Sequence, residues 1–164
     1  MSTSRQSPLH AGAAAAGAHF RERGGWLLPA HFGDAAGEYR QTAASAVFFD
    51  RSAVGKIEVH GADAGSFLHN LCTNDIKGLA EGWGCEALFV TMKARLVAYT
   101  YIDHLACQDG GFWIETAPGM SEKLIRHLDH FLVSEQVEFS DRTHEYAQVH
   151  LAGPRAGEIL VALP

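Results

Sequence analysis

The sequence predicts an α+β fold, with antiparallel or mixed sheets and flanking helices. Between residues 55 and 141, strand-like and helix-like segments follow one another in the order β-α-β-β-β-α-β. Two of the strand-like segments, 85–92 and 95–105, are separated only by a short turn around Lys93 and Ala94, which is typical of a hairpin. Hairpin connections favour an antiparallel sheet with helices on one face over a doubly wound parallel sheet.

The first part of the chain predicts helices and a loop. Ser7 is a suitable N-cap for a helix over residues 8–23, which begins with proline and stops at a Gly-Gly pair. Residues 24–34 combine glycine and proline with a single tryptophan, so we expect a loop held by an aromatic anchor. Asp34 is expected to cap a second helix over residues 35–45.

The remaining elements follow from periodicity and capping residues. In the strand-like segment 55–61, Ile57 and Val59 alternate with polar residues. Ser121 is expected to cap a helix, Pro154 to begin the last one, and residues 108–111 to form a turn. Strands are predicted at 47–50, 55–61, 85–92, 95–105, 111–117, 137–141 and 146–153, and helices at 62–72, 121–133 and 154–163.

Composition excludes several classes of protein. The chain has 164 residues, 47% of them hydrophobic and 20% charged, as in globular domains. Its formal net charge of -6 argues against a protein that coats a nucleic-acid backbone, so no direct nucleic-acid binding is expected. The alanine-rich N-terminus is interrupted by histidine and glycine, and no membrane span is expected. Three cysteines without a CxxC pair favour a reducing, cytoplasmic location.

The segment FLHNLCTNDIK, residues 67–77, is the densest group of reactive side chains. His69 and Cys72 are three residues apart, so on a helix they share a face, as a nucleophile and its base would. Free cysteine is more often a small buried hydrophobe, and Asn74 and Asp75 are typical turn residues. The packing interpretation is therefore the stronger one. The ten histidines are scattered and form no HExxH motif, so no metal site is expected.

Acid–base and stacking candidates lie on predicted strands. The carboxylates are Glu58, Asp103 and Glu115. Each occupies the polar phase of its strand, which also fits a solvated face. Tyr99, Tyr101 and Trp113 lie on adjacent strands, where a flat conjugated ligand could stack; a half-exposed edge of the core fits the same pattern.

Several phrases occur in a specific order and spacing. They are GGWLLPAHFGD (24–34), EYRQTAASAVFFDRS (38–52), VHGADAGSFLHNLCTNDI (59–76), VTMKARLVAY (90–99) and VHLAGPRA (149–156). Together they resemble the N-terminal half of the folate-binding T-protein superfamily, from about residue 8 to the end of the chain. That superfamily includes the glycine-cleavage aminomethyltransferase and a folate-binding branch tied to iron–sulfur cluster assembly or repair and to tRNA modification.

The resemblance implies a domain organisation. Its members have three domains around a central hole that holds tetrahydrofolate. Residues 1–52 and 145–164 would form the first, incomplete part of a discontinuous folate-binding domain, and residues 53–144 an inserted β-α-β-β-β-α-β domain. The third domain would be missing. We therefore expect the chain to be the front part of a longer protein, with an exposed half-interface that promotes self-association.

The same resemblance bears on catalysis. Aminomethyl transfer in relatives relies on an aspartate in a phrase like N-x-x-G-G-x-x-D-D, and the matching positions here carry Ala98 and Tyr99. Tyrosine, with a reference pKa of about 10, cannot act as a base near neutral pH. The run from Thr91 to Arg95 is closer to the T-P-x-G-R phrase of the iron–sulfur branch, with Ala94 replacing its glycine. No catalytic residue is therefore assigned.

Folate contacts carry over position by position. The resemblance implies that the ligand is tetrahydrofolate or a derivative, and that it is contacted by Val54, Tyr99, Trp113, Glu115 and Thr116.

Three hypotheses about function follow. The first is a folate-binding protein that does not transfer aminomethyl groups and supports iron–sulfur protein maintenance, with iron–sulfur proteins as partners. The second is a diverged aminomethyl or one-carbon transferase that uses another carboxylate, such as Asp103 or Glu115. The third is a fragment with no activity of its own.

Overall fold

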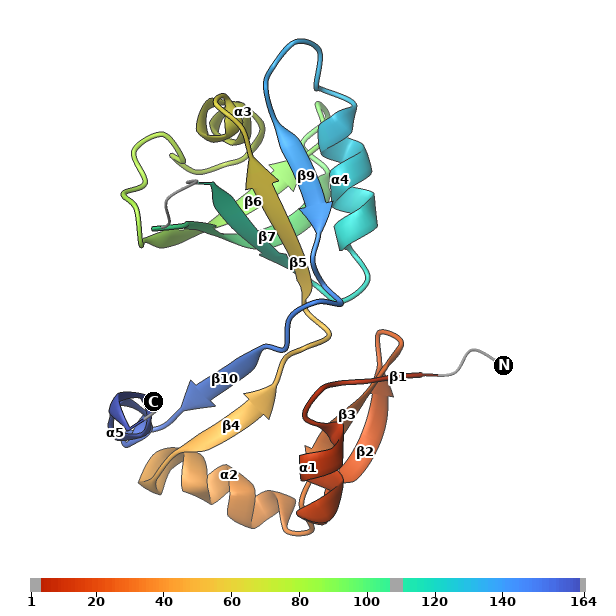
Figure 1. Cartoon of the computed structure of the whole chain (residues 1–164), viewed down its shortest axis with the longest axis vertical. Coiled ribbons are helices and arrows are strands. Elements are labelled where there is room, and N and C mark those ends of the chain that lie inside the picture. Colours follow the sequence, from red (N-terminus) through yellow and green to blue (C-terminus); the bar gives the residue numbers. More distant parts are fainter. Residues whose placement is uncertain (1–3, 107–110, 163–164) are drawn as a thin grey trace. The chain divides into compact units, whose positions relative to one another are not determined.

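The computed structural model describes residues 4–106 and 111–162. Its contacts divide the chain into two units. Unit 1 consists of Met1–Ala53 together with Tyr146–Pro164, and unit 2 is Val54–Glu145 (Figure 1). Unit 2 is thus inserted between the two stretches of sequence that build unit 1. Several sheets with flanking helices confirm the predicted α+β class.

Unit 2 contains one five-stranded sheet, in the strand order β6-β7-β8-β5-β9. The strands are β5 (Gly55–His60), β6 (Gly84–Val90), β7 (Leu96–His104), β8 (Phe112–Thr116) and β9 (Glu138–Asp141). Every neighbouring pair is antiparallel. Strands β6, β7 and β8 follow one another directly, whereas β5 pairs with two strands that come much later in the chain.

Two helices, α3 (Ala64–Leu71) and α4 (Ser121–Asp129), pack with the sheet around one hydrophobic core. Leu68 of α3 and Leu124 of α4 are completely buried, as are Ile57 and Ile114 of the sheet. Because strand side chains alternate between faces, the residues between these inward positions lie on the opposite face. The elements of unit 2 follow one another along the chain in the predicted order β-α-β-β-β-α-β.

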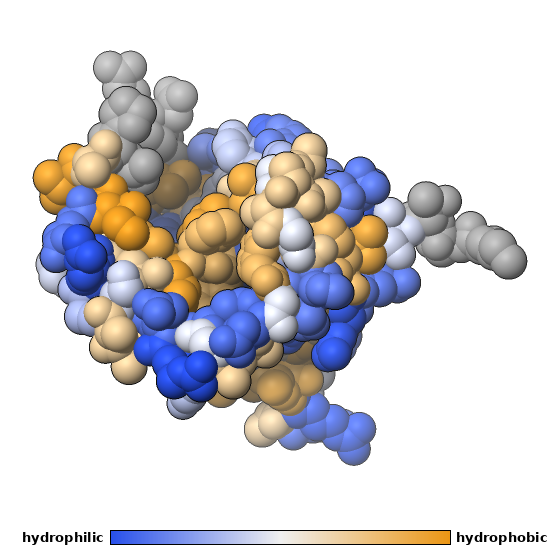
Figure 2. All heavy atoms as spheres, turned by 90° about the horizontal axis from the view of Figure 1, so that it is seen from below, coloured by the Kyte–Doolittle hydropathy of each residue, from blue (hydrophilic) through white to orange (hydrophobic). Residues whose placement is uncertain are grey.

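Unit 1 contains two small sheets. Its elements are β1 (Arg5–Gln6), α1 (His10–Ala15), β2 (His19–Arg23), β3 (Trp26–His31), α2 (Ala35–Ala44), β4 (Val47–Asp50), β10 (Val149–Ala152) and α5 (Ala156–Val161). The sheets have the orders β1-β3-β2 and β10-β4. Trp26, Leu28 and Ala53 form a minor core. Large apolar side chains remain exposed, Phe48 and Leu160 among them, and Figure 2 shows apolar residues gathered on the face seen from below.

The structure corrects the predictions for the first 34 residues. The helix predicted over residues 8–23 is wrong, because only His10–Ala15 is helical and the segment from His19 onward is strand β2. The loop predicted at 24–34 is also wrong, since it contains strand β3. Gly24 and Gly25 both have positive φ, 59° and 81°, as a tight two-residue hairpin turn requires.

Elsewhere the predicted elements recur with shifted ends. Asp34 caps α2 as expected, with its Oδ1 accepting the backbone N–H of Gly37 at 2.9 Å. Ser121 is not the N-cap of α4; Met120 occupies that position, and the Ser121 hydroxyl instead hydrogen-bonds Thr143 Oγ1 at 3.1 Å. Helix α4 also ends at Asp129, earlier than predicted. Most of the turn predicted at 108–111 lies outside the described residues.

Candidate functional site

The face of the unit 2 sheet opposite its core, called the outer face below, carries most of the candidate residues. In β7 and β8 the inward positions are buried, and the alternate residues Tyr99, Tyr101, Trp113 and Glu115 are exposed or half-buried. The register sets Tyr101 opposite Glu115 and Asp103 opposite Trp113. Directly opposite residues in an antiparallel pair have neighbouring side chains. Aromatic rings and carboxylates therefore alternate across two adjacent strands.

Tyr99 is held by a residue that the sequence did not single out. Its ring is 53% exposed, and its hydroxyl donates a hydrogen bond to the carboxylate of Glu86 on β6. This hydrogen bond raises the pKa of Tyr99 above its ordinary value, with smaller contributions from burial and from the negative charge of Glu86. Glu86 escapes sequence reasoning because its proximity depends on the register of β6 against β7, in which it faces Tyr101.

Asp103 is a carboxylate of the outer face whose pKa is raised. It is half-buried, and burial raises its pKa, with a further contribution from the negative charge of Glu115. A carboxyl group with a raised pKa holds its proton closer to neutral pH than an ordinary aspartate does, which is the property a general acid needs.

Val54 and Thr116 are more deeply buried than the other three candidates, Tyr99, Trp113 and Glu115. Val54 is 9% exposed, and its carbonyl accepts a hydrogen bond from Lys56 Nζ at 2.9 Å. Lys56 is 2% exposed and lies opposite Glu115 in the β5–β8 ladder. The Thr116 side chain is buried on the core side of β8, and its hydroxyl donates to the Tyr99 carbonyl at 3.3 Å. Thr116 thus fixes the backbone of Tyr99 and does not reach the outer face.

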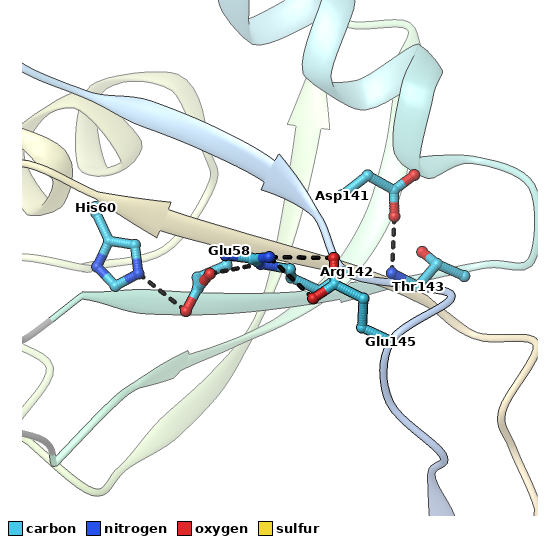
Figure 3. Close-up of polar contacts among 6 residues, drawn as sticks. All are labelled: Glu58, His60, Asp141, Arg142, Thr143 and Glu145. Atoms are coloured by element: carbon cyan, nitrogen blue, oxygen red, sulfur yellow. Dashed lines mark hydrogen bonds and ion pairs between the residues drawn. The ribbon is translucent and has the colours of Figure 1, made fainter.

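A charged network lies at the β5–β9 side of the sheet (Figure 3). The Glu58 carboxylate accepts from Arg142 Nε at 2.8 Å and lies 3.0 Å from His60 Nε2. The hydrogen bond with His60, followed by that with Arg142, lowers the pKa of Glu58. Arg142 also donates to both carboxylate oxygens of Glu145, at 3.1 and 2.9 Å. Glu58 is therefore an ionised structural group rather than a base available to a substrate.

The segment FLHNLCTNDIK is a helix end and a turn. Cys72 packs against the core of unit 2, its Sγ contacts the carbonyl of Asn74 at 3.4 Å, and burial raises the pKa of the thiol. His69 is paired with Asp75, with 3.1 Å between Nδ1 and Oδ1. A raised pKa lowers the thiolate fraction on which nucleophilicity depends. These contacts support a packing role for Cys72.

Within residues 4–106 and 111–162, no three histidine, cysteine or acidic side chains are grouped so that they could hold a metal ion. The same part of the chain contains no helix long and apolar enough to cross a membrane.

The chain is similar to known proteins along almost its whole length. A family model described as the GCVT N-terminal domain matches residues 9–164. The aminomethyltransferase of Rubrobacter xylanophilus is 30% identical over 159 residues, which cover 96% of this chain and 42% of the relative. That of Prosthecochloris aestuarii is 29% identical over 156 residues, covering 95% of this chain and 43% of the relative.

A solved structure has the same fold. The crystal structure of glycine cleavage system aminomethyltransferase T from Bartonella henselae superposes with a TM-score of 0.87 at 24% identity, over 98% of this chain and 44% of the other. The chain thus spans less than half the length of the curated relatives it matches.

Proposed function

The chain belongs to the GCVT N-terminal domain family, and from this premise we propose that the outer face of its unit 2 binds tetrahydrofolate or a derivative. The observation that carries the proposal is the register of β7 and β8, which sets Tyr101 beside Glu115 and Asp103 beside Trp113. The exposed ring of Tyr101 and the half-buried ring of Trp113 offer stacking surfaces for a pterin, and the carboxylates can accept hydrogen bonds from its ring N–H and amino groups. Tyr99 adds a third ring, which is exposed, to the same face.

Within this family, we propose binding without aminomethyl transfer. Tyr99 stands where the resemblance expects the catalytic aspartate, and its pKa is raised by Glu86 above a reference value of about 10. A tyrosine of this kind does not accept a proton at neutral pH. Ala94, with φ of 54°, occupies the glycine position of the T-P-x-G-R phrase. This likeness supports a role in maintaining iron–sulfur proteins, with those proteins as partners. The three cysteines without a CxxC pair favour the cytoplasm as the location.

Asp103 favours a second candidate function. The relatives are named aminomethyltransferases, and Asp103 has a raised pKa on the same face as the proposed ligand. A diverged aminomethyl or one-carbon transferase could use it as a general acid, with Glu115 opposite the neighbouring Tyr101. In that case Asp103→Asn would abolish tetrahydrofolate-dependent release of ammonia from an aminomethyl donor. Under the main proposal the unmodified chain releases none.

Calorimetric titration with 5-formyltetrahydrofolate tests the main proposal. We expect measurable binding by the unmodified chain and affinity weaker by about tenfold in Tyr99→Ala, the upper end of what an aromatic contact contributes. Tyr39→Ala is the matched control, because Tyr39 is an exposed tyrosine of unit 1. A well-folded chain that gives no heat would sink folate binding and favour a fragment without activity. Equal affinity of Tyr99→Ala and the unmodified chain would show that the ligand lies elsewhere.

A further inference from the structure

Unit 1 contains a groove that takes no part in the proposed folate site. Its volume is about 1060 Å³, and all the residues that line it lie between Arg21 and Arg51. Small-molecule pockets are mostly about 300–1,000 Å³ and enclose their ligand, so this groove is slightly larger than that range. Its walls come from β2, β3, α2 and β4.

The groove exposes the edge of strand β4. All residues from Ala46 to Arg51 line it. Since side chains alternate along a strand, a wall made by one face of β4 would include only every second residue. Six successive lining residues indicate that the edge of the strand borders the groove.

The backbone groups on that edge are available for pairing. The Arg51 N–H donates to the Gln148 carbonyl at 2.8 Å, and the β4–β10 register continues with Phe49 opposite His150. In an antiparallel ladder the intervening residues, Phe48 and Asp50, direct their N–H and C=O groups to the other edge. Among the described residues these groups have no backbone partner on that side. An unpaired edge of this kind is a template for another strand.

The acidic and basic side chains that line the groove differ in whether they have hydrogen-bond partners within the chain. Its two acidic groups have partners, since Asp50 accepts from the Ser7 hydroxyl and Glu38 accepts from the Phe32 N–H at 2.7 Å. The side chains of Arg21 and Arg23 are exposed and form no hydrogen bond or ion pair within the described part of the chain, although the backbone of both residues is paired with β3. Being two residues apart on β2, they project to the same side of the strand. The groove therefore offers two arginines to an anionic partner.

Apolar side chains complete the surface. Phe48 and Phe49 line the groove and are 54% and 48% exposed. An occupant must therefore combine apolar contact, negative charge and main-chain hydrogen-bonding groups.

We propose that this groove binds an extended peptide segment of alternating acidic and apolar residues, which adds a strand to the free edge of β4. Main-chain hydrogen bonds to Phe48 and Asp50 would supply affinity, and carboxylates facing Arg21 and Arg23 would supply specificity. A nucleic acid would satisfy the arginines but offers no repeating N–H and C=O groups to the edge. A second copy of β4 is a poorer match, because the charge of its Asp50 is cancelled by Arg51, the residue that follows the strand.

A synthetic probe tests the proposal with the whole chain. The probe is a fluorescein-labelled ten-residue peptide of alternating valine and glutamate, and binding is followed by anisotropy. A valine–lysine peptide of the same length is the first control. We expect the acidic peptide to bind at least tenfold more tightly. The double variant Arg21→Glu/Arg23→Glu should remove this preference, whereas Lys123→Glu/Arg126→Glu, with the same charge change on α4, should retain it.

Two proline variants test the strand edge itself. Phe48→Pro removes an N–H that points into the groove, and Val149→Pro removes one on the far edge of the same two-stranded sheet, since both residues lie out of phase with the ladder bonds. With folding checked by circular dichroism, only Phe48→Pro should weaken the acidic peptide, by at least tenfold. Any of four results would overturn the proposal. Two are an equal loss of binding in both proline variants and equal binding of the lysine peptide. The other two are tighter binding of an oligouridylate and a stable dimer that excludes the peptide. Folate titration is independent of all these outcomes.

Discussion

The hydroxyl of Tyr99 on β7 donates to the carboxylate of Glu86 on β6. A carboxylate from a neighbouring strand thus lies beside the position at which the resemblance expects a catalytic aspartate. The Glu86 carboxylate is the hydrogen-bond acceptor of the Tyr99 phenol and is not an unpaired carboxylate. The hydrogen bond restrains the orientation of an exposed tyrosine side chain on the outer face, which favours its use as a stacking surface.

Replacing Glu86 by glutamine should lower the pKa of Tyr99 toward that of an ordinary tyrosine. The neutral phenol loses a charged acceptor, and the phenolate loses a negative neighbour, so both changes favour ionisation. The measurement is a pH titration of phenolate absorbance, with Tyr99→Phe used to identify the contribution of this residue. Glu122→Gln, on α4, is the control and should leave the curve unchanged. An unaltered curve for Glu86→Gln would show that the two side chains do not interact in solution.

The hydrogen bonds of Glu58 with His60 and Arg142 should make the stability of the fold depend on pH. Folding lowers the pKa of Glu58, so its contribution is present above the ordinary glutamate pKa of about 4.3 and is lost as pH falls through the lower, folded value. Glu58→Gln should reduce the free energy of unfolding by about 1 kcal/mol at neutral pH. In urea titrations at a series of pH values, the difference from the unmodified chain should disappear at strongly acidic pH. A difference that persists there would assign the effect to packing.

Gly61 should tolerate alanine poorly. Its φ is 122°, and an added Cβ would collide with the carbonyl oxygen of Gln136. We expect Gly61→Ala to lower the free energy of unfolding by about 3 kcal/mol or more, because backbone must move as well as adopt a strained conformation. Gly119→Ala is the matched control, since its φ is 76° but its Cβ would meet open space. It should cost about 1 kcal/mol, and equal losses in the two variants would contradict the steric argument.

Replacing Ala94 by glycine should stabilise the folded chain. It is the non-glycine residue with positive φ, 54°, among those described, and it lies in the turn between β6 and β7. An L-residue in this conformation is strained, so Ala94→Gly should raise the free energy of unfolding by about 1 kcal/mol. Ala80→Gly, at an exposed position with ordinary φ, should instead lower it by about 0.5 kcal/mol. Thermal or urea unfolding of the two variants distinguishes them by sign.

Unit 2 was predictable because its strands are half-buried. Residues such as Ile57 and Val59 alternate with polar neighbours only when one face of a strand meets a core. In the N-terminal part, burial is slight and the alternation fades. Alanine-rich sequence then favours helix over residues 8–23, while the positive φ of Gly24 and Gly25 imposes a hairpin. In this segment the geometry of the hairpin turn determines the structure, and the helix propensity of the alanines does not.

The candidate site was predictable residue by residue but not as a set of contacts. Alternation alone indicates that Tyr99 and Trp113 avoid the core. The register of the sheet determines that Glu86 reaches Tyr99. It also determines that Lys56 lies opposite Glu115. Register is determined by the turns and by the packing of the opposite face, neither of which a single strand sequence contains.

The insertion of unit 2 has a consequence for the order of folding during synthesis. Strand β4 leaves the ribosome early, but its partner β10 follows roughly 100 residues later, a delay of about 5–20 s at ordinary elongation rates. The inserted unit has all its strands by Asp141, so it is expected to reach its native structure first. The edge of β4 that pairs with β10 meanwhile lacks its partner, and it is a site that a chaperone could bind until the returning strand arrives.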